Sequence, residues 1–368
     1  MRGGCAPGRC RGRNHGTGSS VGIVLGVTRL SIRAPKGWLG PGHTVDDVQV
    51  VCEDGVVRSA GPAGPVEVDQ EIIVDGFLMP AVADRHVHVE LSDPASILLG
   101  GVTAVRDLAW PPERIFPLAD LSEMPSFEGP LIRACGPMLT GPGGYPSQAS
   151  WAPEGTAREV AGPEDAAVAV GEVTAAGAAA VKVSLNAEAG PTPSDAVLLA
   201  IVDAARGAGV PVTVHAQGMG QVERALGAGV DELAHTPWSP LSDDTIRTAA
   251  GSLRIVSTLD IHGSDGDAIP LEVALDNLRR FVSAGGEVVY GTDLGNGPIP
   301  PGIHVREIAL MMRAGVTGER LLAALIRAPL EPEAPADLIA LGMDPFETVE
   351  AFADRRLVVR SGRVVLGR

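Results

Sequence analysis

Between residues 76 and 335 the chain alternates short apolar runs with longer segments rich in alanine and leucine, and this alternation constrains the fold most strongly. The short runs have the length and composition of strands. The longer segments, such as residues 194–207 and 271–284, have the apolar spacing of amphipathic helices. Strands that alternate with helices are typical of βαβ units around a parallel sheet. We therefore predict an α/β fold for this region.

Eight of the apolar runs are candidate strands. Their carboxyl ends fall near His88, Asp107, Gly136, Ser184, His215, His235, Leu259 and Asp293. Eight parallel strands separated by helices can close into a (β/α)8 TIM barrel, in which functional side chains gather at the carboxyl ends of the strands. We predict this barrel for residues 76–335. An open, doubly wound sheet is the competing interpretation, because periodicity alone does not distinguish the two.

The two ends of the chain share a different pattern. Residues 21–75 and 336–368 contain short apolar runs separated by turn signals such as Asp54-Gly55 and Ser361-Gly362, as in β-hairpins. We predict one small β-sandwich domain built from both ends. Residues 1–20 are rich in glycine and arginine and are interpreted as a flexible tail, so Cys5, Cys10 and His15 are not assigned to a metal site. Whether this tail belongs to the natural mature chain is left open.

Charge and hydropathy narrow the choice of partners. The formal net charge of −16 would repel nucleic acid and anionic membrane surfaces. No stretch approaches the roughly 20 uninterrupted apolar residues that span a bilayer, and the run over residues 21–27 is interpreted as a strand. Four cysteines, two of them in the tail, favour a reducing compartment. We expect a cytoplasmic protein that acts on a small-molecule substrate and has no nucleic-acid or membrane partner.

Four histidines fall at the ends of candidate strands. His86 and His88 follow the first barrel strand, and residues two apart on a strand point to the same face, so both imidazoles can reach one cation. His215 and His235 each close a later βα unit. In a barrel the four imidazoles would converge on one rim from three strands. The sequence therefore predicts a metal site there.

Lysine is rare in this chain. Lys36 and Lys182 are the only two lysines among 29 basic residues, and Lys182 lies in an apolar strand where an unpaired ammonium is costly to bury. Burial lowers the pKa of a lysine, and a neutral amine can react with carbon dioxide to give a carbamate, an anionic oxygen ligand for two cations. The alternative is a lysine paired with an acid such as Glu188.

A carboxylate ends the last candidate strand. Asp293 follows the run over residues 288–292 and precedes Gly295, Asn296 and Gly297. An aspartate in this place can touch a metal-bound water and shuttle its proton. Taken alone, the same residue would be typical of a helix cap.

Taken in order, the His-x-His pair, Lys182, His215, His235 and Asp293 resemble the amidohydrolase superfamily, specifically its imidazolonepropionase-like and Xaa-Pro-dipeptidase-like branch. Residues 100–107, 136–144 and 225–235 are similar to recurring segments of that branch. The resemblance covers about residues 50–341.

The resemblance implies a binuclear, metal-dependent hydrolase of C–N amide bonds. His86, His88 and Asp293 would hold one divalent cation, His215 and His235 the other, and carbamylated Lys182 would bridge them. Zn²⁺ is the expected metal, with Mn²⁺, Fe²⁺ and Co²⁺ as alternatives. A bridging hydroxide would attack the amide carbonyl, while Asp293 takes its proton and returns it to the leaving nitrogen. The expected substrate is a dipeptide, an N-acyl amino acid or a cyclic amide, and analogy with the family suggests a homo-oligomer.

This chain departs from the family pattern in two ways, at Tyr145 and in the connection from the last barrel helix to Ala336, which is shorter than usual. Tyr145, in Gly143-Gly144-Tyr145, stands where relatives often have a histidine. We predict Tyr145, His262 and His304 as substrate-binding residues, although exposed loop positions would explain the two histidines equally well. Trp238 is interpreted as a wall of the site or as simple packing.

Three other functions compete with amide hydrolysis. A mononuclear deaminase of an aminated heterocycle would use similar imidazoles, but such enzymes usually place a glutamate shortly after the histidine of the fifth strand. Here His215 precedes Ala216-Gln217-Gly218-Met219-Gly220, which has no glutamate. A lactone or ester hydrolase could use the same site. A silent metal-binding protein would not need a proton shuttle such as Asp293.

Overall fold

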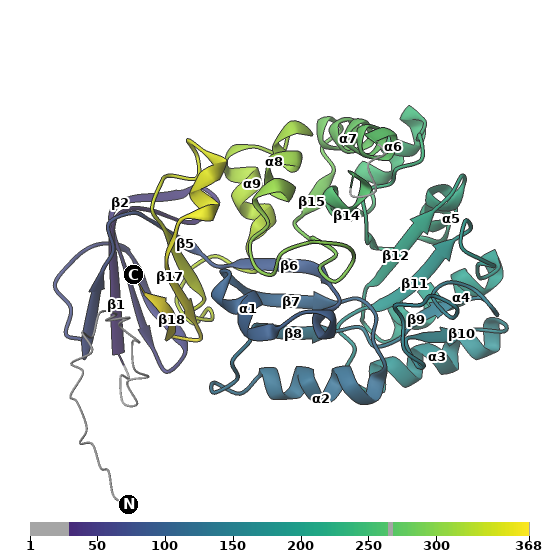
Figure 1. Cartoon of the computed structure of the whole chain (residues 1–368), viewed down its shortest axis with the longest axis horizontal. Coiled ribbons are helices and arrows are strands. Elements are labelled where there is room, and N and C mark those ends of the chain that lie inside the picture. Colours follow the sequence, from purple (N-terminus) through teal and green to yellow (C-terminus); the bar gives the residue numbers. More distant parts are fainter. Residues whose placement is uncertain (1–28, 264–267, 368) are drawn as a thin grey trace, which may run out of the picture.

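The computed structural model describes residues 29–263 and 268–367 (Figure 1). The predicted tail over residues 1–20 and the predicted strand over residues 21–27 lie outside the described residues.

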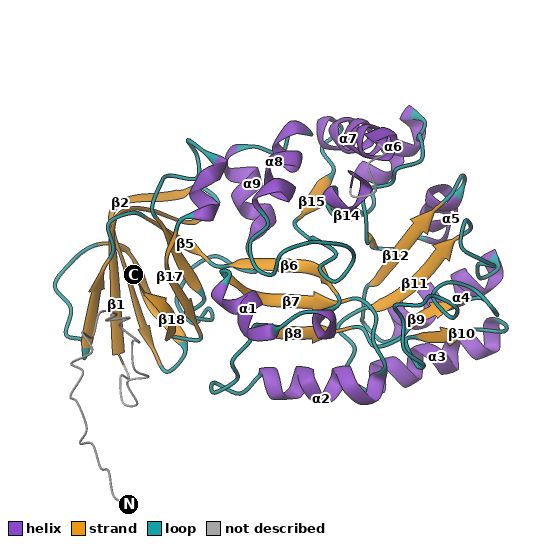
Figure 2. Ribbon diagram, in the orientation of Figure 1, coloured by secondary structure: helices purple, strands orange, loops and turns teal. Residues whose placement is uncertain are grey.

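Strands and helices alternate through the middle of the chain, and strands predominate at both ends (Figure 2). The strands are β1 (Arg29–Gly40), β2 (His43–Glu53), β3 (Val56–Pro62), β4 (Gln70–Ile73), β5 (Phe77–Pro80), β6 (Val82–Val87), β7 (Val102–Asp107), β8 (Leu131–Ala134), β9 (Met138–Thr140), β10 (Ala157–Glu159), β11 (Val181–Asn186), β12 (Val212–Gln217), β13 (Glu232–Leu233), β14 (Arg254–Val256), β15 (Glu287–Val289), β16 (Leu338–Leu341), β17 (Arg355–Arg360) and β18 (Arg363–Gly367). The α-helices are α1 (Pro94–Leu99), α2 (Pro112–Ser122), α3 (Pro163–Ala175), α4 (Asp195–Gly207), α5 (Gln221–Ala228), α6 (Asp243–Ala250), α7 (Ala268–Ser283), α8 (Val305–Arg313) and α9 (Gly318–Leu325). Three short 3-10 helices are η1 (Val89–Leu91), η2 (Asp260–Gly263) and η3 (Val349–Ala353).

The parallel strands of the middle region form two sheets. One has the order β6-β7-β8, and the other has the order β10-β9-β11-β12-β13-β14-β15. The eight predicted strands correspond to β6, β7, β8 and β11 to β15. Each observed end lies within four residues of its predicted position, the largest difference being Asp293 against Val289. The mixed α/β class is therefore confirmed.

Backbone hydrogen bonds link the two parallel sheets at both edges. At one edge Ala179 donates to Ala134 over 2.8 Å. At the other, Asp293 donates to His86 over 2.8 Å and His88 donates to Leu294 over 2.7 Å. These bonds place β6 beside the segment that follows β15. The strands do not form one continuous sheet, so a closed barrel stays a prediction.

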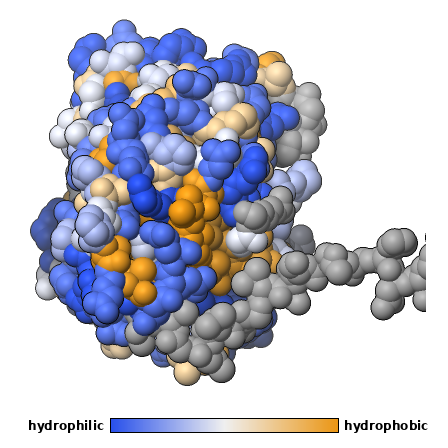
Figure 3. Space-filling model, turned by 90° about the vertical axis from the view of Figure 1, so that its left-hand side faces the viewer, coloured by the Kyte–Doolittle hydropathy of each residue, from blue (hydrophilic) through white to orange (hydrophobic). Residues whose placement is uncertain are grey.

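Both ends of the chain contribute to a third sheet, of eight strands. Its order is β18-β17-β16-β5-β1-β2-β3, with β4 paired to β1. The antiparallel pairing of β5 with β16 joins the two ends, and apolar residues from both ends share one core, including Ile32, Val50, Leu338 and Val359. Figure 3 shows the molecule from the side of this sheet, which is the left-hand side of Figure 1, and the surface there is mainly hydrophilic around a central apolar area. The sandwich packing and the domain boundaries stay predictions.

Helix α4 shows how the sequence specifies the helices. The Ser194 side chain accepts a hydrogen bond from the Val197 amide, which caps the helix. Val197, Leu198, Ile201, Val202 and Ala205 are buried at helical spacing. The predicted start at residue 194 therefore agrees with the structure, whereas the predicted start at Leu271 lies inside α7, which already includes Ala268. In the described part of the chain, none of the helices has the length and apolar character needed to cross a membrane.

Candidate metal centre

All six predicted metal ligands lie in or just after parallel strands. His86 is in β6, Lys182 in β11 and His215 in β12, whereas His88, His235 and Asp293 follow β6, β13 and β15. Each residue is between 1% and 8% exposed. Because carboxyl ends of parallel strands meet at one edge, residues far apart in the sequence share one buried region.

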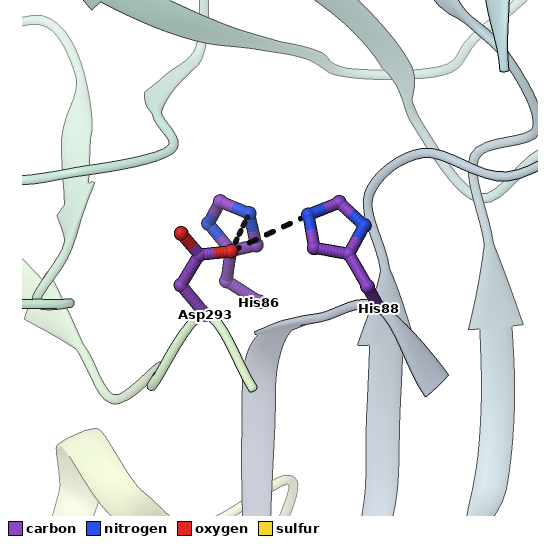
Figure 4. Close-up of side chains that lie close together, drawn as sticks. All are labelled: His86, His88 and Asp293. Atoms are coloured by element: carbon purple, nitrogen blue, oxygen red, sulfur yellow. Dashed lines mark ion pairs between the residues drawn. The ribbon is translucent and has the colours of Figure 1, made fainter. Parts of the chain in front are cut away.

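Three of these residues form a compact donor set. Asp293 Oδ1 lies 3.1 Å from His86 Nε2 and 3.3 Å from His88 Nε2 (Figure 4). One nitrogen from each imidazole and one carboxylate oxygen lie within 4.8 Å of one another. Two imidazole nitrogens and a carboxylate oxygen are ligands that suit Zn²⁺ and similar cations.

Hydrogen bonds orient the imidazoles. His86 Nδ1 lies 2.8 Å from the Ala234 carbonyl oxygen, and His88 Nδ1 lies 3.1 Å from that of Ala109. A carbonyl only accepts, so each Nδ1 carries the hydrogen and each Nε2 is left with a free lone pair. His215 is oriented the other way: its Nε2 lies 3.0 Å from Gln217 Oε1, and donation there leaves Nδ1 as the free ligand atom.

His215 and His235 extend the cluster. Their ring centroids are 4.7 Å apart, and His235 is 4.5 Å from His86. Burial lowers the pKa of His86 to about 4 and that of His215 to about 3, and it lowers the pKa of His235 well below its ordinary value. Metal ions bind neutral imidazole, so these three rings are already in the ligand form at neutral pH.

Lys182 is buried without a hydrogen-bond partner. It is 1% exposed, and its Nζ contacts no acceptor among the described residues. Burial lowers its pKa to about 7, although Asp293 opposes the shift. The alternative partner Glu188 instead accepts a hydrogen bond from Gln217 over 2.7 Å. An unpartnered buried amine beside neutral imidazoles and a carboxylate fits a site that a divalent cation completes.

Asp293 is held by its surroundings. Burial alone would raise its pKa, but the neighbouring His86 and His88 keep the pKa well below its ordinary value. Asn296 donates to Oδ2 over 2.9 Å, which leaves Oδ1 facing the imidazoles. The backbone φ of Asp293 is 59°, in the left-handed region. A few residue types such as aspartate tolerate this conformation, and it is enriched at functional sites.

Asp84 has a positioning role that the sequence reasoning missed. Its buried carboxylate accepts from the amides of His86 and Thr292 and from the Thr292 hydroxyl over 2.5–3.1 Å. These bonds tie the end of β6 to the segment that carries Asp293. The available signal was the position of Asp84 two residues before His86, on the same face of one strand. Thr258, whose hydroxyl lies 3.0 Å from His235 Nδ1, gave no such signal.

The predicted substrate-binding residues lie in different surroundings. Tyr145 stacks on His215, with centroids 5.5 Å apart and ring planes 29° apart. His262 packs against Trp238, which also contacts His215 and His235. His304 Nε2 instead pairs with Asp260 over 2.6 Å. Trp151, 4.8 Å from His88, was missed.

One surface hollow is lined by other residues. Its volume is about 460 Å³, and its lining includes Pro240, Ile269, Glu272 and Arg280 but none of the candidate ligands. It therefore has no share in the chemistry of the imidazole cluster.

Comparison with known proteins gives the fold clearly. No protein-family model matches the chain. Uncharacterized proteins of Mycobacterium bovis and Mycobacterium tuberculosis are 26% identical to it, over 86% of this chain and 91% of theirs. Among solved structures, a Xaa-Pro dipeptidase with bound methionine superposes with a TM-score of 0.80 at 19% identity, over 92% of this chain and 100% of that one.

Two further solved structures have a similar fold. A putative prolidase from Bifidobacterium longum gives a TM-score of 0.77 at 24% identity, over 93% of this chain and 96% of that one. An ochratoxinase from A. niger gives a TM-score of 0.78 at 18% identity, over 92% of this chain and 96% of that one. The chain thus has the fold of amidohydrolase-type proteins of the Xaa-Pro dipeptidase kind. The resemblance expected from the sequence is confirmed as a likeness of fold.

Proposed function

We propose that this chain is a metal-dependent hydrolase of C–N amide bonds, a member of the amidohydrolase superfamily whose two parallel sheets form one (β/α)8 barrel. The observation that carries the proposal is the convergence of His86, His88 and Asp293, within 4.8 Å of one another, beside two further imidazoles and a buried amine. Structures of the same fold that are described as a dipeptidase, a prolidase and an ochratoxinase support amide hydrolysis.

The residues present fit two divalent cations. His86, His88 and Asp293 would hold one, and His215 and His235 the other. A carbamate on Lys182 would supply oxygen to both, since its amine is buried, free of hydrogen bonds and has a lowered pKa. Zn²⁺ suits this donor set. When bound, such cations lower the pKa of water and polarise a carbonyl oxygen.

Asp293 is the proposed proton carrier. Its lowered pKa keeps it ionised at neutral pH, and the hydrogen bond from Asn296 to Oδ2 fixes the carboxylate. The fixed carboxylate can therefore accept a proton from the attacking water and return it to the leaving nitrogen.

Tyr145 is the proposed donor to the substrate oxygen. Burial raises its pKa to about 12, so the phenol keeps its hydrogen. The Trp151 indole donates to the Tyr145 oxygen over 3.1 Å. Because this bond uses the phenol as an acceptor, its hydrogen stays free to donate to a developing oxyanion.

Metal content and turnover test the proposal together. We expect about two metals per purified chain when bicarbonate is supplied during expression, and fewer in Lys182→Ala. We expect Asp293→Asn to lower kcat on an amide panel by about 10²–10⁴-fold, since it removes proton transfer. Asn296→Ala is the matched control: it removes the bond to Oδ2 but keeps the carboxylate, and should cost much less. Equal turnover by Asp293→Asn would refute the mechanism, and one metal unaffected by loss of Lys182 would refute the binuclear centre.

A further inference from the structure

The tryptophans and tyrosines that are not buried all lie at the metal centre. The chain has four Trp and two Tyr in 368 residues. Trp38, Trp110 and Tyr290 are at most 3% exposed. The other three, Tyr145, Trp151 and Trp238, are partly exposed, and each contacts a candidate ligand. A chain with only four Trp and two Tyr thus places its accessible tryptophans and tyrosines at one site.

Ring contacts form a closed circuit around the centre. From Trp151 the circuit passes to His88 (4.8 Å), His86 (5.6 Å), His235 (4.5 Å), His215 (4.7 Å), Tyr145 (5.5 Å) and back to Trp151 (6.2 Å), measured between centroids. Trp238 lies 6.0 Å from His235 and 6.1 Å from His215. The candidate ligands are less than one-tenth exposed, and these partly exposed rings are the aromatic surfaces that pack directly against them.

Arginines near the starts of α2, α5 and α8 are already paired. Arg114 of α2 pairs with Glu90, Arg224 of α5 pairs with Asp195 over 2.6 Å, and Arg306 of α8 pairs with Asp260 over 2.5 Å. A substrate carboxylate would have to compete with these acids, in a chain of net charge −16. Neither these paired arginines nor the net charge of the chain therefore attracts an anionic molecule, which favours an uncharged one.

We propose that the substrate of this centre is an uncharged amide with a flat aromatic group attached to the bond that is cleaved. This inference rests on the proposed amide hydrolysis and narrows it. An aryl group would pack on Trp151, Trp238 or Tyr145, and aromatic ring pairs attract each other beyond the effect of the area that they bury. A free dipeptide, which carries a carboxylate and an ammonium, would have to desolvate both charges.

A matched set of amides tests the inference on the metal-loaded protein. The probes are acetyl-4-nitroanilide, its anionic analogue succinyl-4-nitroanilide, the non-aromatic N-cyclohexylacetamide, and the dipeptide Ala-Pro. We expect kcat/KM for the neutral anilide to exceed each of the others by at least tenfold. Trp238→Leu should lower it at least fivefold, mainly through KM. Phe346→Leu is the control, because Phe346 is also exposed (38%) and packs on Phe77 in the eight-stranded sheet.

The outcomes separate this inference from the proposed function. If Ala-Pro or the succinyl compound is cleaved better than the neutral anilide, the substrate class is wrong while amide hydrolysis stands. If no amide is cleaved, amide hydrolysis is wrong, and quenching of tryptophan fluorescence by the neutral anilide decides about the aromatic site. Stronger quenching than by the succinyl compound, lost in Trp238→Leu but kept in Phe346→Leu, supports that site. Equal quenching by both compounds overturns it.

Discussion

Lys182 combines full burial with an amine that has no hydrogen-bond partner among the described residues. A group of this kind destabilises the folded state unless something compensates it. Our proposal assigns that compensation to a carbamate and two cations. If so, the lysine costs stability in the metal-free protein and is retained for its chemistry.

Replacing Lys182 with methionine separates these two effects. Methionine has similar length but no charge, so we expect Lys182→Met to raise the free energy of unfolding of the metal-free protein by about 1–3 kcal/mol. The same variant should bind about one metal fewer per chain. Denaturant unfolding after chelation and elemental analysis measure the two quantities. A less stable metal-free variant would instead show that Lys182 has a structural partner.

At the scale of elements, the site depends on how closely the segment after β15 approaches β6. Gly291 lies at this approach: a Cβ there would overlap Val256 Cγ1 and lie 3.1 Å from the backbone nitrogen of His86. We expect Gly291→Ala to separate His86 from Asp293 and weaken metal binding by about 10–100-fold, as loss of supporting contacts around a metal does.

Gly227→Ala controls for the change of glycine to alanine itself. Gly227 lies inside α5, and a Cβ there would meet nothing within 4 Å. We expect this variant to keep its metal affinity and gain about 0.5–1 kcal/mol of stability from helix propensity. Metal titration of both variants makes the comparison, and equal affinities would mean that the spacing between β6 and β15 is not critical.

Glu307 connects helix α8 to the loop that follows β14. Its buried carboxylate accepts from the amides of Leu259 and Asp260 over 2.9 and 2.8 Å, and burial raises its pKa from 4.5 to about 7. Between these values the unfolded chain has released the proton while the folded chain keeps it. The free energy of unfolding therefore falls as the pH rises from about 4.5 to 7, by about 3 kcal/mol from this group.

Glu307→Gln removes this titration. Relative to the variant, the wild-type protein should be more stable at pH 5 than at pH 8, by up to about 3 kcal/mol. Urea unfolding at the two pH values measures the difference. Glu272→Gln, which changes an exposed ion pair with Arg313, is the control for the change of glutamate to glutamine itself. A constant gap between wild type and Glu307→Gln would refute a raised pKa at Glu307.

Local sequence signals predicted most of the strands and helices, but only part of the set of residues that surrounds the metal centre. Alternating apolar runs located the eight parallel strands β6, β7, β8 and β11 to β15, and Ser194 located the start of α4. Strand spacing also placed His86 and His88 on one face. It could not place Trp151 beside His88 or pair His304 with Asp260, because loop conformation brings those residues to their partners. The strands β9 and β10, at one end of the seven-stranded sheet, were not predicted.

At the scale of the molecule, the chain surrounds a mostly neutral set of imidazoles with a strong excess of negative charge. The net charge of −16 creates a field that repels anions over about 30 Å at 0.01 M salt and about 10 Å at 0.1 M salt. An anionic substrate should therefore reach the centre more easily as salt is added, whereas a neutral substrate should be unaffected.

The pair of nitroanilides tests this effect directly. Between 10 and 300 mM NaCl we expect kcat/KM for succinyl-4-nitroanilide to rise several-fold, since screening removes the repulsion. The value for acetyl-4-nitroanilide should stay constant and thereby control for effects of salt on the enzyme itself. Parallel curves for the two compounds would mean that the negative charge of the chain does not reach the centre. The preference for a neutral substrate would then have to come from the paired arginines and the aromatic rings alone.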